Sequence, residues 1–334
     1  MMQKNNSSYE EKRDQAAYYE NGMEDPDRTF AYYCTNWLSA NCTCLKVSSL
    51  IKYERDMEKH IIPFFGRDRP CEISSEKVTA FTKMLLEERG LSPKTVRNIL
   101  GLFHAVLNYA RKKNGFRFRG PDIIYPKESR KTIRVLNERE EEQFIRFLAK
   151  EMDIFKFGVY MALRTGMRIG EICALRWHDI SFETYTISVC HTAQRIRSMN
   201  EDTGTRTKVM IGTPKSESSR RIIPLMPDVA ALCTRFCRTA SETFVLTGTD
   251  QCMDPRKLQR RLKTYTEICG MEAVHFHTLR HTFATRCVEA GFDVKTLSEI
   301  LGHSNIGITM NQYVHPNLDL KRENMSRLKI VLPF

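Results

Sequence analysis

The sequence lacks the features of a secreted, disulfide-bonded or membrane-spanning protein. Its 11 cysteines are scattered without a CxxC pair, and the first 27 residues contain no apolar stretch typical of signal peptides. No apolar run approaches the roughly 20 residues that span a bilayer. The odd number of cysteines argues against a disulfide scaffold, so we expect a cytoplasmic protein with reduced thiols.

A metal-binding pattern is also missing. The spacing of cysteines and histidines fits no zinc motif, and His277 and His303 lack the nearby carboxylates of metal-dependent phosphodiesterases. Cys173 and Cys287 lie in apolar helical stretches, where a cysteine behaves as a small hydrophobic residue. We therefore expect no bound metal.

Positive charge is what the sequence has in excess. Its 334 residues include 52 Lys and Arg against 40 Asp and Glu, a formal net charge of +12. Residues 1–27 hold three basic and seven acidic side chains, so the chain from Arg28 onward carries +16. This surplus favours a polyanionic partner, most commonly nucleic acid. The alternative is that the charge serves solubility alone.

The spacing of apolar residues predicts a helical unit over residues 28–115, preceded by a flexible acidic tail at 1–27. The clearest helix has Ser92 as its N-cap and Pro93 at its first position, and it ends at Asn114-Gly115. Three earlier helices are predicted: one capped by Asp27, one from about Val47 to His60 before Pro63, and one from Ser74 or Ser75 to Arg89.

Residues 116–135 are predicted to be a basic linker, and a second domain is predicted over residues 136–316. That domain begins with a capping box between Asn137 and Glu140. Strand-like runs between positions 185 and 225 predict a small antiparallel sheet, and helices resume after them. The segment 317–334 ends in an apolar patch that we expect to dock in cis or in trans. The expected fold class is therefore mainly α with a small antiparallel β-sheet.

Two basic residues of the second domain are candidates for binding an anion. Arg168 follows a Thr-Gly break and opens a helix, where exposed backbone amides also suit an anion. Its plainer interpretation is a surface arginine paired with Glu171. Lys215 lies at a predicted turn between strands and could donate a proton to a leaving oxygen. It could equally be an ordinary turn lysine, and Lys208 is a rival candidate.

Two later strings supply histidines, an arginine and a tyrosine. His277 and Arg280 are three residues apart on a predicted helix, so they share a face that could bind a phosphate, although it could also be a solvated face. We expect His281 to point elsewhere and to be structural. Tyr313 follows His303 by ten residues on a predicted short helix. Its hydroxyl would be a poor nucleophile without nearby cations and a base; alternatively, it faces the core.

Together, the strings TGMRIGE, PKSESSRR, HTLRHTFAT and LGHSNIGITMNQY resemble the signature of the tyrosine recombinase family, the lambda-integrase-like proteins. The order Arg, Lys, His-x-x-Arg, His, Tyr is that family's order. The style of the motifs is similar to integrases of conjugative transposons and phages. The resemblance covers residues 28–316 and implies a helical core-binding domain followed by a catalytic domain.

The resemblance implies a role for each matched residue. Tyr313 would attack the scissile phosphate to form a 3′-phosphotyrosyl link, and Arg168 and Arg280 would hold the non-bridging oxygens. Lys215 would protonate the leaving 5′-oxygen. The remaining roles follow: His277 would accept the tyrosine proton or hold the phosphate, His303 would donate to a phosphate oxygen, and Glu171 would support Arg168. Because a phosphotyrosine conserves the energy of the broken bond, no cofactor, ATP or Mg²⁺ is expected.

Three departures from the family pattern stand out. The lysine is followed by Ser216 where relatives usually have threonine, which keeps Lys208 open. Tyr313 lies ten residues after His303, where some relatives have nine. Residues 1–27 are shorter and more acidic than the arm-binding domain of long integrases, which suggests a simple recombinase that needs only core sites.

The expected partner is double-stranded DNA at attachment or core sites, bound by a homotetramer on two sites, with a directionality factor as a possible addition. Phosphate contacts are expected from basic residues on or after the fourth helix, although these could equally form a solvated face. These residues are Lys94, Arg97, Arg111, Lys112, Lys113, Arg117 and Arg119. The alternatives are a DNA-relaxing or resolving enzyme with the same chemistry, a non-catalytic DNA-binding regulator, and metal-dependent phosphoryl transfer.

Overall fold

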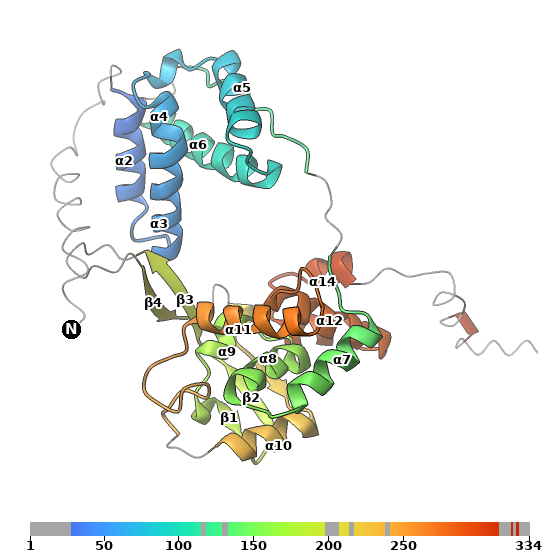
Figure 1. The fold of residues 1–334 in the computed structure, drawn as a ribbon. Helices are drawn as coiled ribbons and strands as arrows, with labels where there is room; N and C mark the ends of the chain where they lie inside the picture. Colours follow the sequence, from blue (N-terminus) through green and yellow to red (C-terminus); the bar gives the residue numbers. More distant parts are fainter. Residues whose placement is uncertain are drawn as a thin grey trace, which may run out of the picture. The chain divides into compact units, whose positions relative to one another are not determined.

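The computed structural model describes residues 28–114, 118–128, 133–197, 207–213, 217–237 and 241–313, together with residues 322, 325 and 326. The chain divides into two compact units, Met1–Lys131 and Thr132–Phe334 (Figure 1). Each unit has its own apolar core. The tail 1–27 and nearly all of the segment 317–334 lie outside the described residues. The prediction that Asp27 caps the first helix is wrong, because α2 begins at Phe30 with Thr29 at its N-cap position.

The described part of the first unit is helical. Its helices are α2 (Phe30–Ala40), α3 (Val47–Asp56), α4 (Ile62–Phe65), α5 (Ser75–Lys83) and α6 (Pro93–Lys113). Two π-helical turns, Met57–Ile61 and Met84–Glu88, extend α3 and α5. The predicted start of α6 is confirmed, because the Ser92 side chain accepts a hydrogen bond from the Thr95 backbone.

The prediction that the second helix ends before Pro63 is wrong. The chain continues from α3 through the π turn into α4, with Pro63 in the first turn of α4. Just before the proline, the π turn shifts the hydrogen-bond register, because the Ile62 N–H donates to the Met57 carbonyl five residues earlier. The helical path therefore reaches Phe65, whose fully buried ring lies 4.7 Å from that of Phe103 between ring centroids.

Part of the segment predicted as a linker packs on the first unit. Phe118, Ile123 and Tyr125 are partly buried against its apolar core. The Arg111 side chain donates to the Phe118 carbonyl at 3.2 Å, and Arg97 donates to the Pro126 carbonyl at 3.2 Å. Two of the arginines expected to contact DNA therefore also hold this segment.

The second unit is mainly helical. Its helices are α7 (Glu138–Ala149), α8 (Ile154–Thr165), α9 (Ile169–Cys173), α10 (Pro227–Phe236), α11 (Pro255–Ile268), α12 (Phe276–Glu289), α13 (Val294–Leu301) and α14 (Ile306–Tyr313). The predicted capping box is confirmed: Asn137 accepts from the Glu140 backbone, and the Glu140 carboxylate accepts from the Asn137 backbone. Helix α8 contacts α7, α9, α10, α11 and α12, so it is central to the unit.

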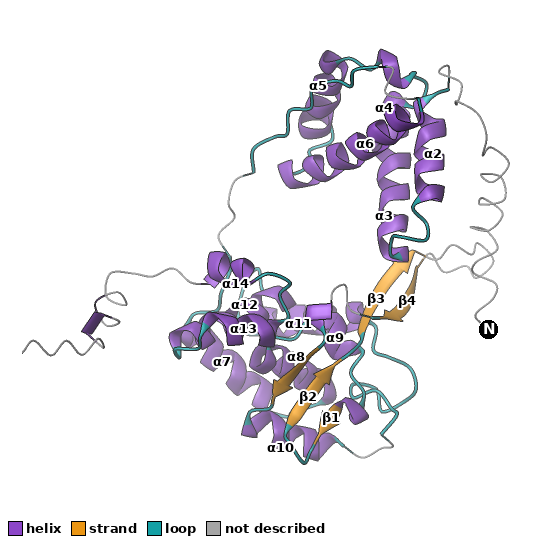
Figure 2. Ribbon diagram, turned by 180° about the vertical axis from the view of Figure 1, so that it is seen from behind, coloured by secondary structure: helices purple, strands orange, loops and turns teal. Residues whose placement is uncertain are grey.

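The described strands of the second unit form two sheets, where one was predicted. Strands β1 (Ile180–Ser181), β2 (Thr186–Val189) and β5 (Arg221–Pro224) make an antiparallel sheet in the order β1-β2-β5. Strands β3 (Thr192–Arg197) and β4 (Thr207–Gly212) pair separately (Figure 2). The sheets separate because β5 returns to pair with β2, where Ile187 and Ile223 lie opposite each other in the core.

Within the described ranges, no helix has the length and apolar character required to cross a membrane.

Candidate active site

Elements that are far apart in the sequence meet at one place in the second unit. The start of α9 supplies Arg168, β5 supplies Arg221, and α12 supplies Arg280. The start of α9 is fixed locally by Gly166, which ends α8 at a φ of 64°. A Cβ at that position would lie 2.5 Å from a ring carbon of Phe283, so a larger residue is excluded by space as well as by backbone conformation.

Arg168 is bound to Glu171 through both backbone and side chain. Its backbone N–H donates to Glu171 at 2.9 Å, and its guanidinium donates to the same carboxylate at 2.8 Å. A second guanidinium nitrogen donates to the Gly302 carbonyl at 3.2 Å. The Arg168 side chain remains one-third exposed, at 34%, while Glu171 is buried. The pair is thus no simple surface ion pair, because its carboxylate lies inside the protein.

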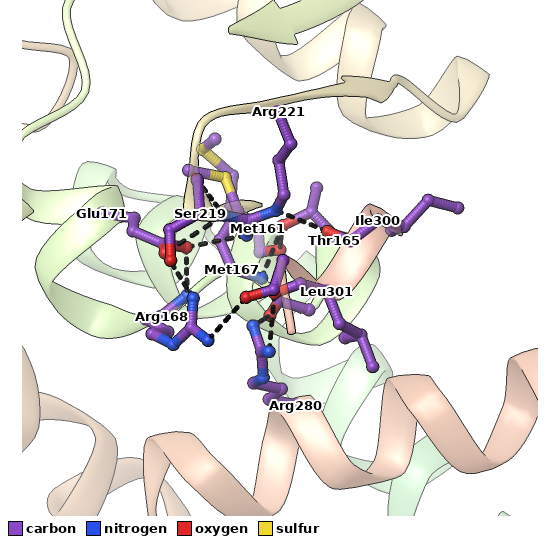
Figure 3. Close-up of polar contacts among 12 residues, drawn as sticks. Met161, Thr165, Met167, Arg168, Glu171, Ser219, Arg221, Arg280, Ile300 and Leu301 are labelled. Carbon is purple, nitrogen blue, oxygen red and sulfur yellow. Dashed lines mark hydrogen bonds and ion pairs between the residues drawn. The ribbon is translucent and has the colours of Figure 1, made fainter. Parts of the chain in front are cut away.

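Arg221, which the sequence did not single out, is a further residue of the candidate site. Its two terminal nitrogens donate to the two Glu171 oxygens at 3.1 and 2.8 Å, and both side chains are almost fully buried (Figure 3). A third nitrogen donates to the Ile300 carbonyl, which ties β5 to the end of α13. The sequence feature that could have identified Arg221 is the alternation of side chains along β5. Arg221 lies two residues before the buried Ile223, so both side chains face inward.

The two arginines keep Glu171 charged despite its burial. Burial by itself raises the pKa of this carboxyl, but the hydrogen bonds and charge of Arg221, followed by the charge of Arg168, outweigh it and lower the pKa below its ordinary value. Glu171 therefore holds two guanidinium groups in place at neutral pH.

Arg280 is 4% exposed and donates to two backbone carbonyls, Gly166 at 2.8 Å and Leu301 at 2.7 Å. These bonds join the ends of α8 and α13 to the middle of α12 (Figure 3). Burial first, and then the charge of Arg168, lower the pKa of Arg280 to about 9. The group is still protonated at neutral pH, so the described site has three guanidinium groups around one carboxylate and favours an anion.

The Tyr313 hydroxyl lies 2.6 Å from Nδ1 of His281, and the two ring centroids are 5.6 Å apart. The expectation that His281 points elsewhere is therefore wrong. His281 follows His277 by four residues, which on a helix is the same face, and the centroids of these two rings are 6.3 Å apart. The spacing of four from His277 to His281 places both rings on this face, as the spacing of three does for His277 and Arg280.

The ring of Tyr313 is seated on α12 and α13. It packs with Ala284, Cys287, Leu297 and Leu301, and 8% of the residue is exposed. Burial raises the pKa of the Tyr313 hydroxyl, although the charges of Arg280 and Arg168 act in the opposite direction. The sequence left two interpretations of Tyr313 open, a core residue and a reactive hydroxyl. Its ring packs in a small apolar core, and its hydroxyl contacts the imidazole of His281.

The histidines of the site are neutral at pH 7. The pKa of His281 is lowered to about 4 by burial, and then by His277 and Arg280. The pKa of His303 is lowered to about 4 by burial and then by the charges of Arg280, Arg168 and Arg221. His303 Nδ1 is hydrogen-bonded to the Thr309 hydroxyl at 2.8 Å. His277 is the most exposed of the three, and burial followed by Arg280 also lowers its pKa.

The structure does not bring every predicted residue into this site. Lys215 and Arg117 lie outside the described residues, so the choice between Lys215 and Lys208 stays a prediction; Lys208 is exposed on β4. The DNA-contact candidates that are exposed and described are Lys94, Arg97, Lys112, Lys113 and Arg119.

In the parts of the chain that the structure covers, no group of three His, Cys, Asp or Glu residues could hold a metal ion.

Comparison with known proteins gives a consistent result. Residues 134–319, more than half of the chain, match the model of the phage integrase family. A tyrosine recombinase XerC-like protein of Caldanaerobacter subterraneus subsp. tengcongensis is 25% identical over 81% of this chain and 74% of its own length. The ICEBs1 integrase of Bacillus subtilis is 24% identical over 83% of this chain and 76% of its own length.

Solved structures share the fold. The Tn1549 transposon integrase in complex with transposon right end DNA has a TM-score of 0.74 at 24% identity, covering 90% of this chain and 99% of that one. A lambda integrase tetramer bound to a Holliday junction has a TM-score of 0.62 at 14% identity, covering 89% of this chain and 81% of that one. At these identities, the likeness shows the fold, which confirms the expected class of a mainly helical protein with small antiparallel sheets.

Proposed function

This chain belongs to the phage integrase family, and on that premise we propose that it integrates or excises a mobile DNA element by cutting and rejoining DNA at specific sites. Its function is that of a tyrosine-type site-specific recombinase. The observation that carries the mechanism is the contact of the Tyr313 hydroxyl with His281, under the positive charges of Arg280 and Arg168.

The chemistry that we propose is a phosphoryl transfer to Tyr313. Its oxygen bonds to phosphorus as the bond to the 5′-oxygen breaks, which leaves a 3′-phosphotyrosyl link and a free 5′-hydroxyl. Arg168 and Arg280 bind the non-bridging oxygens and offset the charge of the pentacoordinate state. The observed bonds to Glu171 and to backbone carbonyls fix both arginines beforehand, so little reorganisation is required when DNA binds.

Other residues have supporting roles in this proposal. Lys215 protonates the departing 5′-oxygen. His303, whose Nδ1 is engaged by Thr309, donates from Nε2 to a phosphate oxygen. His277, exposed beside Arg280, binds the phosphate. Glu171 acts through Arg168 and Arg221 and is a positioning residue. Because the phosphotyrosine keeps the energy of the broken bond, the reaction is proposed to need no ATP, Mg²⁺ or other cofactor.

The proposed substrate is double-stranded DNA. We assign the first unit to core-site binding and the second to catalysis, with Lys94, Lys112, Lys113 and Arg119 available for phosphate contacts. A homotetramer on two sites is proposed because the lambda integrase neighbour is a tetramer on a Holliday junction. We add a directionality factor as a further partner and a cytoplasmic location to the proposal.

The test is covalent capture. A nicked suicide duplex, spanning the end junction of the element that carries the gene, is incubated with wild type and with Tyr313→Phe, in EDTA and without ATP. An SDS-resistant protein–DNA band that requires Tyr313 supports the proposal. Salt-sensitive DNA binding without such a band favours the non-catalytic regulator, and relaxation of plasmids without pairing of two sites favours the DNA-relaxing enzyme.

The two candidate lysines are separated with a modified substrate. Replacing the bridging 5′-oxygen by sulfur creates a leaving group that needs no protonation. We expect Lys215→Ala to slow cleavage of the ordinary duplex by about 100-fold and to regain the rate on the sulfur-containing duplex. Lys208→Ala is the matched control and should cut both at the wild-type rate; the reverse pattern would assign the role to Lys208.

A further inference from the structure

The hydrogen bond between Tyr313 and His281 joins two elements that the sequence separates by 32 residues. Tyr313 is the last residue of α14, and His281 lies in the middle of α12, directly after Arg280. The Tyr313 ring is fixed by the apolar side chains of α12 and α13. The hydroxyl therefore meets His281 through the packing of the helices, and not through a flexible side chain that could point in many directions.

Both partners of this hydrogen bond are neutral at pH 7, so its direction depends on which ring nitrogen of His281 carries the hydrogen. Burial raises the pKa of Tyr313, so its hydroxyl carries a proton at neutral pH. His281 has a pKa lowered to about 4 and is uncharged. A neutral imidazole has one donor and one acceptor nitrogen. In the tautomer with the ring hydrogen on Nε2, the Tyr313 hydroxyl donates and Nδ1 of His281 accepts.

We propose that His281 holds the Tyr313 hydroxyl and accepts its proton as the Tyr313 oxygen bonds to phosphorus. This inference rests on the proposed function. The proton passes from the phenolic oxygen to Nδ1, the new O–P bond forms, and the leaving 5′-oxygen takes a different proton from the cationic acid assigned to Lys215. When the phosphotyrosyl link is reversed, the imidazolium of His281 returns the proton to the tyrosine.

Arg280 links the basicity of His281 to the binding of DNA. Besides burial, His277 and the positive charge of Arg280 lower the pKa of His281. A phosphate anion bound to Arg280 offsets that charge, so the imidazole becomes a stronger base when the scissile phosphate arrives. Without DNA, His281 is too weak a base to remove the proton, and the tyrosine stays protonated.

The other histidines of the described site are less well placed for this step. Nδ1 of His303 is engaged by the Thr309 hydroxyl, and His277 is exposed beside Arg280. The contact with the reacting oxygen is made by His281, at 2.6 Å. His281 therefore replaces His277, four residues earlier on the same helix face, as the proposed acceptor of the Tyr313 proton.

The experiment measures the single-turnover rate of covalent complex formation on the nicked suicide duplex, at saturating protein, between pH 6 and pH 9.5. His281→Asn keeps an acceptor oxygen but takes up no proton, and His281→Phe fills the site without an acceptor. His178→Asn removes an imidazole from the 3₁₀ turn Trp177–Asp179 and is the matched control. DNA affinity and the thermal midpoint verify that each variant folds.

We expect both His281 variants to cut at least about 100-fold more slowly than wild type at pH 7, while the control cuts at the wild-type rate. The residual rate of the variants should rise about tenfold per pH unit, because the tyrosine must then lose its proton to solvent. The rate of covalent complex formation by wild type should depend less steeply on pH than that of either variant.

Faster cutting by either variant would mean that His281 restrains the tyrosine, which overturns the proposal. A wild-type rate in His281→Asn would reduce the role to hydrogen bonding and overturn proton acceptance. These outcomes differ from failure of the proposed function, in which wild type itself forms no Tyr313-dependent covalent band.

Discussion

The two units of this chain use their buried side chains for different purposes. The first unit is built around aromatic rings such as Phe65, Phe81 and Phe103, which are fully buried and contact one another. The second unit has an apolar core too, yet it also buries Glu171 and Arg280. Buried rings stabilise a fold through area and packing. Buried charges add less stability but hold a site in one geometry, provided that every partner is present.

The largest effect is expected from breaking the buried ion pair of the second unit. Glu171→Gln should destabilise this unit by about 3–5 kcal/mol, because Arg221 loses its counter-charge in a buried position. Cleavage should fall as well, since Arg168 loses its anchor. Denaturant unfolding, with hydrogen exchange of α8 to locate the change, measures the first effect, and the suicide duplex measures the second.

A double variant provides the control for this pair. Replacing Glu171 by Leu and Arg221 by Met removes both charges, and should regain part of the stability without regaining cleavage. Equal stability of Glu171→Gln and wild type would show that the pair is not essential to the second unit.

The aromatic core of the first unit should give the next largest effect. Phe103→Ala should cost about 3 kcal/mol, because a fully buried ring leaves a cavity. The loss should appear as faster hydrogen exchange in α2 and α6, with α8 and α12 unchanged. Equal loss of protection in α8 and α12 would contradict the division into two separately stabilised units.

Acid should weaken the second unit through Glu171. The pKa of Glu171 is lowered in the folded protein, so its contribution to stability is fully present above the pKa of the unfolded chain, near 4.3. That contribution is lost as the pH falls through the lowered folded value. The difference in unfolding free energy between wild type and Glu171→Gln should therefore be constant near pH 7 and shrink below pH 4. A difference that widens in acid would reverse the sign of the argument.

The smallest expected effects come from helix caps, where the two units should behave alike. Ser92→Ala in the first unit and Asn137→Ala in the second each remove a side-chain acceptor from a helix N-terminus, at a cost of about 1 kcal/mol. Denaturant midpoints measure both. Ser92→Gly should cost only a few tenths of that energy, and an equal loss in Gly and Ala variants would point to a cause other than capping.

Local signals predicted the helix starts well. Ser92-Pro93 and the Asn137–Glu140 capping box depend on residues within one helical turn, and both are present. The placement of Arg168 at the start of a helix and of Tyr313 on a short helix is confirmed for the same reason. The path through Pro63 was missed because a π turn changes the hydrogen-bond register, which a proline-based rule does not anticipate.

Two parts of the site were not predictable from spacing alone. Arg221 joins Glu171 across 50 residues, and only the packing of β5 against the starts and ends of helices brings them together. The contact of His281 with Tyr313 was not predictable because the two residues lie 32 positions apart in the chain. The number of sheets was also a matter of pairing, since the alternation of β5 is compatible with more than one neighbouring strand.

By itself, the sequence determined the helix boundaries set by caps, the apolar faces, the excess of positive charge, and the order of the motifs that marks the family. These are properties of residues close together or of the whole composition, so they need no knowledge of packing. The tertiary structure alone decided that Arg221 shares Glu171 with Arg168, and that the Tyr313 hydroxyl meets His281. Hydrogen bonds act over about 3 Å, and only packing brings residues that are far apart in the chain within that distance.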